Sequence, residues 1–466
     1  MTTRAVNLIS LVLVASRVAT AQTLVAPDAE IRTILVDRVD VQRQSVGIVV
    51  GVIEPAGRRV VAYGRLAKDD ARPLNGDTVF EIGSITKVFT SLLLADAVQR
   101  REVALADPIS KFLPEKVKVP ERGGRAITLQ DLSSHVSGLP RLPANMAPKD
   151  ASNPYADYSV EDLYKFLSGY ELTRDVGAQY EYSNLGGGLL GHVLSLRAGM
   201  EYEALVRSRI TGPLGMSSTS ITVSPDMKAR FAVGHSAVLQ PVPNWDLLTL
   251  AGAGALRSTT NDLLTFLAAN LGYAETPLSP AMAAMRDREV RRPTGMLGLS
   301  IALGWHIQTS NFKDIIWHNG GTAGFRTFIG FDPVARTGVV VLSNAGTAAG
   351  PDDIGRHLLD PKLPLMTPAA PPKTRTEVAV DPKIFDGYLG RYQLAPTAIL
   401  TIARTNNQLF AQLTGQPAFE IFPEAPTEYF LKVVDAQLTF ETDGQGKATA
   451  VVLHQSGRNV RAVRIE

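Results

Sequence analysis

Ser84 and Lys87 are the residues of this chain whose types and spacing could support nucleophilic chemistry. An apolar run over residues 78–82 leads to Gly83, and apolar residues with helical spacing follow over 92–98. Side chains three residues apart in a helix share a face, so hydroxyl and amine would lie one turn apart. If that turn is buried, desolvation lowers the pKa of the amine, and the neutral lysine can accept the hydroxyl proton. The competing interpretation, which four residues alone favour, makes Ser84 a helix N-cap and Lys87 a solvated charge.

A second cluster, Tyr182-Ser183-Asn184, places a phenol and a carboxamide just before the glycine run 186–188. Tyr182 can relay a proton if a nearby cation lowers the pKa of its phenol, or if neutral Lys87 serves it. Asn184 carries both a donor and an acceptor, so it can hold Lys87 in place and also bind a substrate amide. The structural alternatives are a core tyrosine and a helix N-cap.

A third cluster, His318-Asn319-Gly320-Gly321, closes an apolar segment with the character of a strand. Glycines at 320 and 321 would let a substrate approach the strand closely and lie along it as an added β-segment. His318 would offer a weak, pH-dependent charge there. The alternative is a histidine buried in the core with its hydrogen bonds satisfied.

Composition excludes several other classes of function. The chain has 466 residues and no cysteine, so disulfides, cysteine nucleophiles and thiolate metal sites are excluded. The seven histidines are scattered without a metal-binding helix motif, and the glycine runs lack the pattern of a nucleotide loop. The net charge is only +2 and no Lys/Arg run stands out, which argues against nucleic-acid binding. We therefore expect no metal and no cofactor, and a small-molecule or peptide substrate as the partner.

The N-terminus has the layout of a secretory signal peptide over residues 1–21. Arg4 precedes an apolar stretch over 5–15, and Ala19-Thr20-Ala21 forms a small-x-small cleavage site. The apolar stretch is too short to span a membrane, and it lacks the charged face of an amphipathic anchor. The sequence thus predicts a periplasmic or secreted protein with no stable membrane anchor once the signal is removed.

The distribution of strand and helix patterns predicts an α/β (α+β) fold for residues 22–360. Apolar runs at 46–53 and 60–63 form a hairpin near the start, and further strands follow from 303 to 344, with helices between them. This order predicts one mixed, largely antiparallel sheet built from both ends of the domain, flanked by helices and joined by an all-helical region. Trp305 and Trp317 should belong to its core.

Helix starts are predicted at Thr128, Ser159 and Thr259, each with an acidic residue three positions later. Residues 141–158 are rich in proline, asparagine and alanine and should form a long loop, which in a compact enzyme is often a wall of the binding site. We expect substrate choice to depend on this loop, on residues 225–255 and on the C-terminal region.

Residues 361–382 contain six prolines and no apolar periodicity, as in an extended linker. Over 383–466 short alternating strands are separated by turn pairs, which predicts a small antiparallel β-barrel or sandwich. A core filled by side chains is the expected interior.

The three clusters, in this order and spacing, resemble the serine β-lactamase and penicillin-binding-protein superfamily in its class C-like branch. That branch includes class C β-lactamases, D,D-carboxypeptidases, D-aminopeptidases and related carboxylesterases. The resemblance covers roughly residues 30–360 and extends to the stretch 127–140, ITLQDLSSHVSGLP. The C-terminal unit resembles the lipocalin-like barrel of some peptidase relatives, where it can limit access to the cleft or mediate assembly, so a homo-oligomer is left open.

The resemblance implies a β-lactamase/transpeptidase-like fold and an exported serine hydrolase working through an acyl-enzyme. It makes Ser84, Lys87 and Tyr182 catalytic. It also places Asn184, His318, Gly320 and Gly321 in the substrate-binding and oxyanion site, with the backbone N–H groups of Ser84 and Gly321 as oxyanion donors.

His318 departs from the class C β-lactamases, which carry a lysine at this position. The His-x-Gly triplet at 318–320 resembles the triplets of D,D-peptidase and D-aminopeptidase relatives, whereas many esterase relatives have tryptophan at the position of this histidine. The resemblance therefore favours peptide or amide substrates, with a β-lactamase or a carboxylesterase as the alternative. A penicillin-binding or sensor protein without turnover ranks last, because Lys87 and Tyr182 are both present.

Overall fold

The computed structural model describes residues 24–466 apart from 71, 311–312, 367–374, 396–397, 415–417, 433, 435 and 456–457. The predicted signal peptide, the centre of the predicted linker and the turn pair at 456–457 lie outside the described residues. Within them, no helix is long and apolar enough to cross a membrane.

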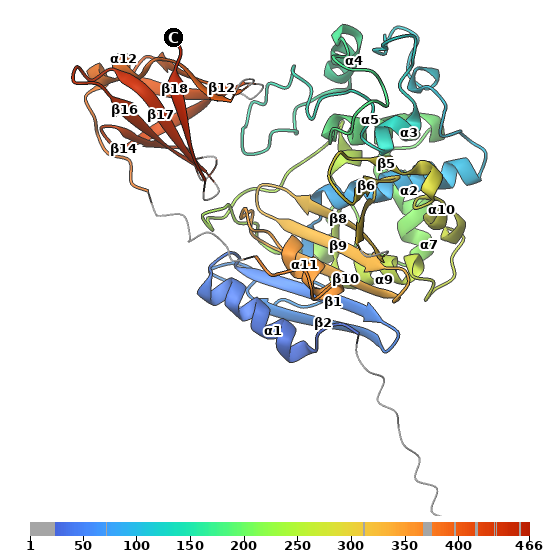
Figure 1. The fold of residues 1–466 in the computed structure, drawn as a ribbon. Coiled ribbons are helices and arrows are strands. Elements are labelled where there is room, and N and C mark those ends of the chain that lie inside the picture. The colour runs from blue at the N-terminus through green and yellow to red at the C-terminus, as the bar shows by residue number, and fades with distance from the viewer. Residues whose placement is uncertain are drawn as a thin grey trace, which may run out of the picture.

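An eight-stranded antiparallel sheet forms the framework of the first unit, in the order β2-β1-β10-β9-β8-β7-β6-β5 (Figure 1). The sheet combines strands from both ends of the domain, as the sequence predicted. These strands meet where β1 pairs with β10, with Val50 opposite Val341. The strands are β1 Gly47–Glu54, β2 Gly57–Gly64, β5 Arg292–Pro293, β6 Leu299–Ile301, β7 His306–Ser310, β8 Lys313–Gly321, β9 Arg326–Asp332 and β10 Thr337–Ser343. A separate two-stranded sheet joins β3 Val79–Glu81 to β4 Arg257–Thr259.

One predicted strand, 303–307, begins later than expected, at His306. Gly304 adopts φ +70°, and the Ala302 N–H donates to the Trp305 carbonyl, so these residues form a tight turn before the strand. Trp305 and Trp317 are buried in the core, as predicted.

Helices cover both faces of the sheet, which explains why every residue of β1 is buried. Ile48 and Val50 face the cluster formed with α1 and α11, whereas Val49 faces the larger cluster that contains α2 and α9. Figure 1 shows α1 beside β1 and β2, and α11 over β9 and β10. The fold prediction is confirmed in class and in the layering of sheet and helices.

The helical region lies between β3 and β5 in the chain, and three of its helices begin at the predicted caps. Thr128 and Ser159 each form a complete capping box, and Thr259 accepts a hydrogen bond from the Asp262 N–H. The helices are α1 Asp28–Val36, α2 Thr86–Gln99, α3 Leu129–Ser133, α4 Val160–Gly169, α5 Asn184–Ala198, α6 Tyr202–Val206, α7 Gly212–Leu214, α8 Pro225–Ala229, α9 Thr260–Asn270, α10 Ser279–Ala284, α11 Asp352–Leu359 and α12 Phe385–Tyr388.

The C-terminal unit is a closed antiparallel barrel whose interior is filled by side chains. Its aromatic core includes Tyr388 stacked on Phe440 with ring centroids 4.4 Å apart, and the fully buried Tyr392 and Tyr429. The strands are β11 Gly390–Ala395, β12 Ala398–Thr405, β13 Gln408–Leu413, β14 Phe419–Ala425, β15 Glu428–Phe430, β16 Ala436–Thr442, β17 Ala448–Gln455 and β18 Arg458–Arg464.

Candidate active site

Ser84 lies in a single 3₁₀ turn, Gly83–Ile85, that joins β3 to α2. The residue at the N-cap of α2 is Ile85 and no side chain caps that end, so the interpretation of Ser84 as a cap is wrong. Gly83 has φ +51° and packs so closely against β8 that a Cβ there would lie 2.7 Å from the Gly321 nitrogen. The turn therefore presents Ser84 beside the end of β8, and its side chain remains partly exposed.

Lys87 is the buried residue at the centre of the site, with 2% of its surface exposed. Its Nζ lies 2.9 Å from Asn184 Oδ1, 2.7 Å from the Ala253 carbonyl oxygen and 3.0 Å from Ser84 Oγ. Burial holds the pKa of Lys87 well below its usual value, and the nearby charge of Arg141 lowers it further. The interpretation of Lys87 as a solvated helix charge is therefore wrong.

The hydrogen bonds of Lys87 define the direction of proton transfer. A neutral amine has two N–H donors and one lone pair, and the oxygens of Asn184 and Ala253 can only accept. When both donors of a neutral amine are directed to these acceptors, its lone pair is available to the Ser84 hydroxyl, whose Oγ lies 3.0 Å away. This geometry suits a general base acting on a serine nucleophile.

Tyr182 completes the immediate surroundings of Ser84. Burial raises the pKa of its phenol, and a hydrogen bond with the Ser84 side chain offsets this in part. Lys87 Nζ lies 4.8 Å from the centroid of the Tyr182 ring. Of the two routes predicted for Tyr182, the structure thus favours a neutral phenol that works with neutral Lys87 over a phenol ionised by a cation.

Asn184 is the first residue of α5 and does not cap it. The cap is Ser183, whose Oγ accepts a hydrogen bond from the Gly186 N–H at 2.8 Å. This leaves both ends of the Asn184 carboxamide free to act in the site: Oδ1 accepts from Lys87, and Nδ2 donates to the Tyr155 hydroxyl at 3.1 Å.

His318 is fully buried on β8, and its environment contradicts the expectation of a charge at this position. Its Nδ1 lies 2.6 Å from the Asn319 carbonyl oxygen, and its ring centroid lies 6.2 Å from that of Tyr182. Burial holds the pKa of His318 well below its usual value, so the imidazole is neutral near pH 7. A neutral histidine can donate or accept a hydrogen bond, but it cannot hold a substrate carboxylate by charge.

Gly320 and Gly321 serve different purposes. A Cβ at 320 would lie 2.0 Å from the Ile82 carbonyl oxygen and 2.3 Å from Thr327 Oγ1, so this glycine is required by packing against the nucleophile turn. Gly321 is exposed, and only this position fits the expectation of a strand open to substrate.

Sequence reasoning gave no site role to His135, Arg141 and Tyr155. His135 adopts φ +55°, accepts from the Ser183 N–H through Nδ1 and packs 4.5 Å from the Tyr182 ring centroid. Arg141 and Tyr155 come from the loop 141–158, and the Arg141 guanidinium lies 5.2 Å from the Tyr182 ring centroid. The stretch 127–140 was a signal for His135, but nothing in the sequence marked the other two.

A partly exposed serine hydroxyl thus lies 3.0 Å from a buried lysine amine, at the meeting point of an antiparallel sheet and a helical region. A family model described as Beta-lactamase matches residues 21–361, and the chain belongs to this family. A second model, described as Domain of unknown function (DUF3471), matches residues 374–464.

Two curated relatives illustrate the range of the family. The chain is 26% identical to Penicillin-binding protein 4* of Bacillus subtilis over 426 residues, which cover 86% of this chain and 91% of the relative. It is 31% identical over 313 residues to the D-alanyl-D-alanine-carboxypeptidase/endopeptidase AmpH of Escherichia coli, covering 64% of this chain and 78% of the relative.

Solved structures agree on the fold. A class C beta lactamase from Rhodobacter sphaeroides is 26% identical with a TM-score of 0.58, covering 68% of this chain and 94% of that one. A beta-lactamase/D-alanine carboxypeptidase from Pseudomonas syringae has a TM-score of 0.60 at 21% identity, covering 69% of this chain and 95% of that one, and supports the fold alone.

Replacing Gly320 by alanine should destabilise the protein and reduce turnover, because the added methyl group separates β8 from the turn that carries Ser84. We expect a loss of about 1–3 kcal/mol in the free energy of unfolding, measured by chemical denaturation. The control is Gly169→Ala at the end of α4, where a Cβ meets nothing within 4 Å. If Gly320→Ala and Gly169→Ala lose similar stability and turnover, the contact with β8 does not hold the turn that carries Ser84.

Replacing Arg141 by glutamine should shift the acidic limb of the pH–rate profile to higher pH. For a base that works as the neutral amine, the rate falls as pH drops through the pKa of Lys87, and removing the nearby cation raises that pKa. Acylation rates from pH 4 to 9 measure the shift. The control, Lys149→Gln, removes a charge from the same loop and should leave the acidic limb of the pH–rate profile unchanged. An unshifted acidic limb in Arg141→Gln would contradict the assignment of this limb to Lys87.

Proposed function

We propose that this chain is an exported serine hydrolase that forms a covalent acyl-enzyme on Ser84 and hydrolyses peptides or amides, as a D,D-peptidase or D-aminopeptidase does. The observation that carries the proposal is the buried Lys87 amine, whose two donors are used by Asn184 and Ala253. Its lone pair is left for the Ser84 hydroxyl at 3.0 Å.

In the first half-reaction Lys87 accepts the proton of Ser84, and Oγ attacks the substrate carbonyl carbon. The resulting oxyanion is bound by the backbone N–H groups of Ser84 and Gly321, as the family resemblance implies. As the C–N bond breaks, the Tyr182 hydroxyl donates its proton to the leaving amine and regains one from the lysine ammonium. A water molecule, deprotonated by the same pair, then hydrolyses the ester bond to Ser84.

Two features favour a peptide or amide over a β-lactam. The His-x-Gly triplet at 318–320, where class C β-lactamases carry a lysine, resembles the triplets of D,D-peptidase and D-aminopeptidase relatives. AmpH, which shares 31% identity, is named as a D-alanyl-D-alanine-carboxypeptidase/endopeptidase. The second candidate function is a β-lactamase, favoured by the 26% identity to a Beta-lactamase of Pseudomonas fluorescens; a carboxylesterase uses the same catalytic residues.

Ser84→Ala should abolish turnover without changing the fold, because only the nucleophile is removed. Lys87→Ala should slow acylation about 10²–10⁴-fold, the contribution of a positioned general base. Both are measured with an activated p-nitrophenyl ester, with circular dichroism to check folding. Normal rates in Ser84→Ala would refute the nucleophile, and near-normal acylation in Lys87→Ala would point to another base.

A substrate panel distinguishes the candidates: D-Ala-D-Ala peptides, D-aminoacyl amides, nitrocefin and short esters. We expect the highest kcat/KM among the D-residue peptides or amides, and intact-mass spectrometry should detect an acyl adduct that is absent in Ser84→Ala. Fast nitrocefin turnover with inert peptides would instead support the β-lactamase.

A further inference from the structure

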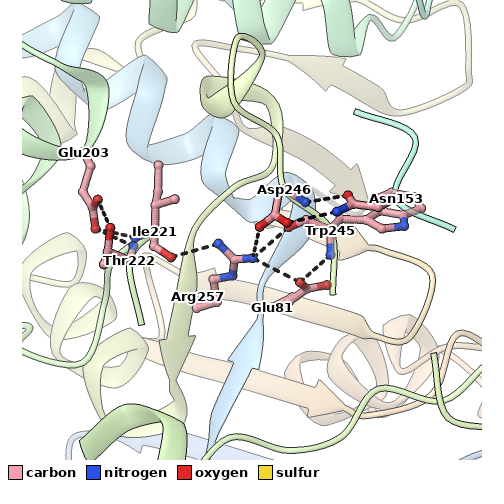
Figure 2. A network of polar contacts seen from close by, with 8 residues as sticks. All are labelled: Glu81, Asn153, Glu203, Ile221, Thr222, Trp245, Asp246 and Arg257. Carbon is pink, nitrogen blue, oxygen red and sulfur yellow. Dashed lines mark hydrogen bonds and ion pairs between the residues drawn. The ribbon is translucent and has the colours of Figure 1, made fainter. Parts of the chain in front are cut away.

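A buried ion pair lies directly before the nucleophile turn. Glu81, on β3, and Arg257, on the paired strand β4, have 3% and 5% of their surfaces exposed, and Arg257 Nη2 lies 3.6 Å from Glu81 Oε1. Figure 2 shows the guanidinium between Glu81 and Asp246, with its other nitrogen directed to Ile221. That nitrogen donates to the Ile221 carbonyl at 2.9 Å.

The pair fixes the backbone of residues 245–246. The Trp245 N–H donates to Glu81 Oε1 at 2.9 Å, and Arg257 Nη2 donates to the Trp245 carbonyl at 2.8 Å. The same nitrogen lies 3.2 Å from Asp246 Oδ1. Because both charges are shielded from water, these bonds hold the segment firmly.

Residues 245–246 in turn hold the loop 141–158. Asn153 and Asp246 bond reciprocally: Asn153 Nδ2 donates to Asp246 Oδ2 at 3.0 Å, and the Asp246 N–H donates to Asn153 Oδ1 at 2.9 Å (Figure 2). Trp245 Nε1 donates to the Ser152 carbonyl at 3.1 Å, and the Trp245 ring lies 5.4 Å from that of Tyr155.

The loop carries this restraint to the reactive amine. Tyr155 is buried, and its hydroxyl accepts from Asn184 Nδ2 at 3.1 Å. The opposite end of the same carboxamide accepts from Lys87 Nζ at 2.9 Å. A continuous series of contacts therefore leads from Arg257 to the amine beside Ser84.

We propose that Asn153, Trp245, Asp246 and Arg257 form a clamp that holds the loop 141–158 and, through Tyr155, fixes the Asn184 carboxamide that orients Lys87. These four are positioning residues, remote from the reacting atoms. The inference rests on the proposed role of Lys87 as the base.

The test compares Asn153→Ala with Asn145→Ala. Asn145 is an asparagine in the same loop with two side-chain bonds of its own, to the Asp162 carbonyl and the Tyr158 hydroxyl, and it does not touch the clamp. Asn153→Ala should lower the acylation rate about tenfold, within the range for small misplacements of a catalytic group. Asn145→Ala should leave it unchanged, with similar thermal midpoints for both variants.

Two further readouts separate positioning from general loosening of the loop. In Asn153→Ala the acidic limb of the pH–rate profile should move to higher pH, since a less confined amine is better solvated. In an Asn184→Ala background, Asn153→Ala should have little further effect on the rate, because its route to Lys87 is already cut.

Three results would each overturn the clamp. The first is an equal loss of acylation rate in Asn145→Ala and Asn153→Ala, and the second is an unshifted acidic limb of the pH–rate profile in Asn153→Ala. The third is a full additional loss of rate when Asn153→Ala is combined with Asn184→Ala. Ser84→Ala and Lys87→Ala, run in the same assay, keep the two proposals apart. If Ser84→Ala abolishes acylation, Lys87→Ala slows it as expected and Asn153→Ala does not affect it, only the clamp fails. If Ser84→Ala and Lys87→Ala retain normal acylation, the proposed catalytic roles fail.

Discussion

The geometry of the site depends on the burial of the Lys87 amine. Burial holds the pKa of Lys87 well below its usual value, the nearby charge of Arg141 lowers it further, and two carbonyl oxygens accept hydrogen bonds from the amine. These acceptors belong to α5 and to the turn Ala251–Ala253, while the lysine belongs to α2, so three segments must meet around a single nitrogen atom. Gly187 makes this contact possible, since a Cβ there would lie 3.0 Å from Lys87 Cε.

The sheet supplies the second half of the site by a similar close approach. Thr327 Oγ1 on β9 donates to the Ile82 carbonyl at 3.0 Å, and Gly320 on β8 leaves the space that this bond needs. The turn bearing Ser84 is thus held against the sheet by the contacts of Ile82 with Gly320 and Thr327. It is held near α5 by the bond from Lys87 to Asn184. A serine with ordinary reactivity becomes a candidate nucleophile because both supports act on the same short turn.

The sequence predicted those features that depend on local chemistry. Helix caps at Thr128, Ser159 and Thr259 follow from side chain–backbone bonds within four residues, and each is present. That one sheet contains strands from both ends of the domain followed from their apolar patterns, whereas the pairing of β1 with β10 was not predicted. Features set by tertiary burial were not accessible: the neutral state of His318, and the choice of Ser183 over Asn184 as the cap of α5, depend on what packs around them.

The loop 141–158 illustrates why the remainder of the site could not be inferred. Its residues have no periodicity, yet Arg141 lowers the pKa of Lys87, and Tyr155 holds the carboxamide that contacts the amine. The loop was expected to form a wall of the binding site and to influence substrate choice. In the folded chain Arg141 and Tyr155 also lie close to Lys87 or its hydrogen-bond partner, so changes at these two residues are expected to alter the pKa or the position of the amine. We therefore expect such changes to affect the acylation rate in addition to any contact that the loop makes with the substrate.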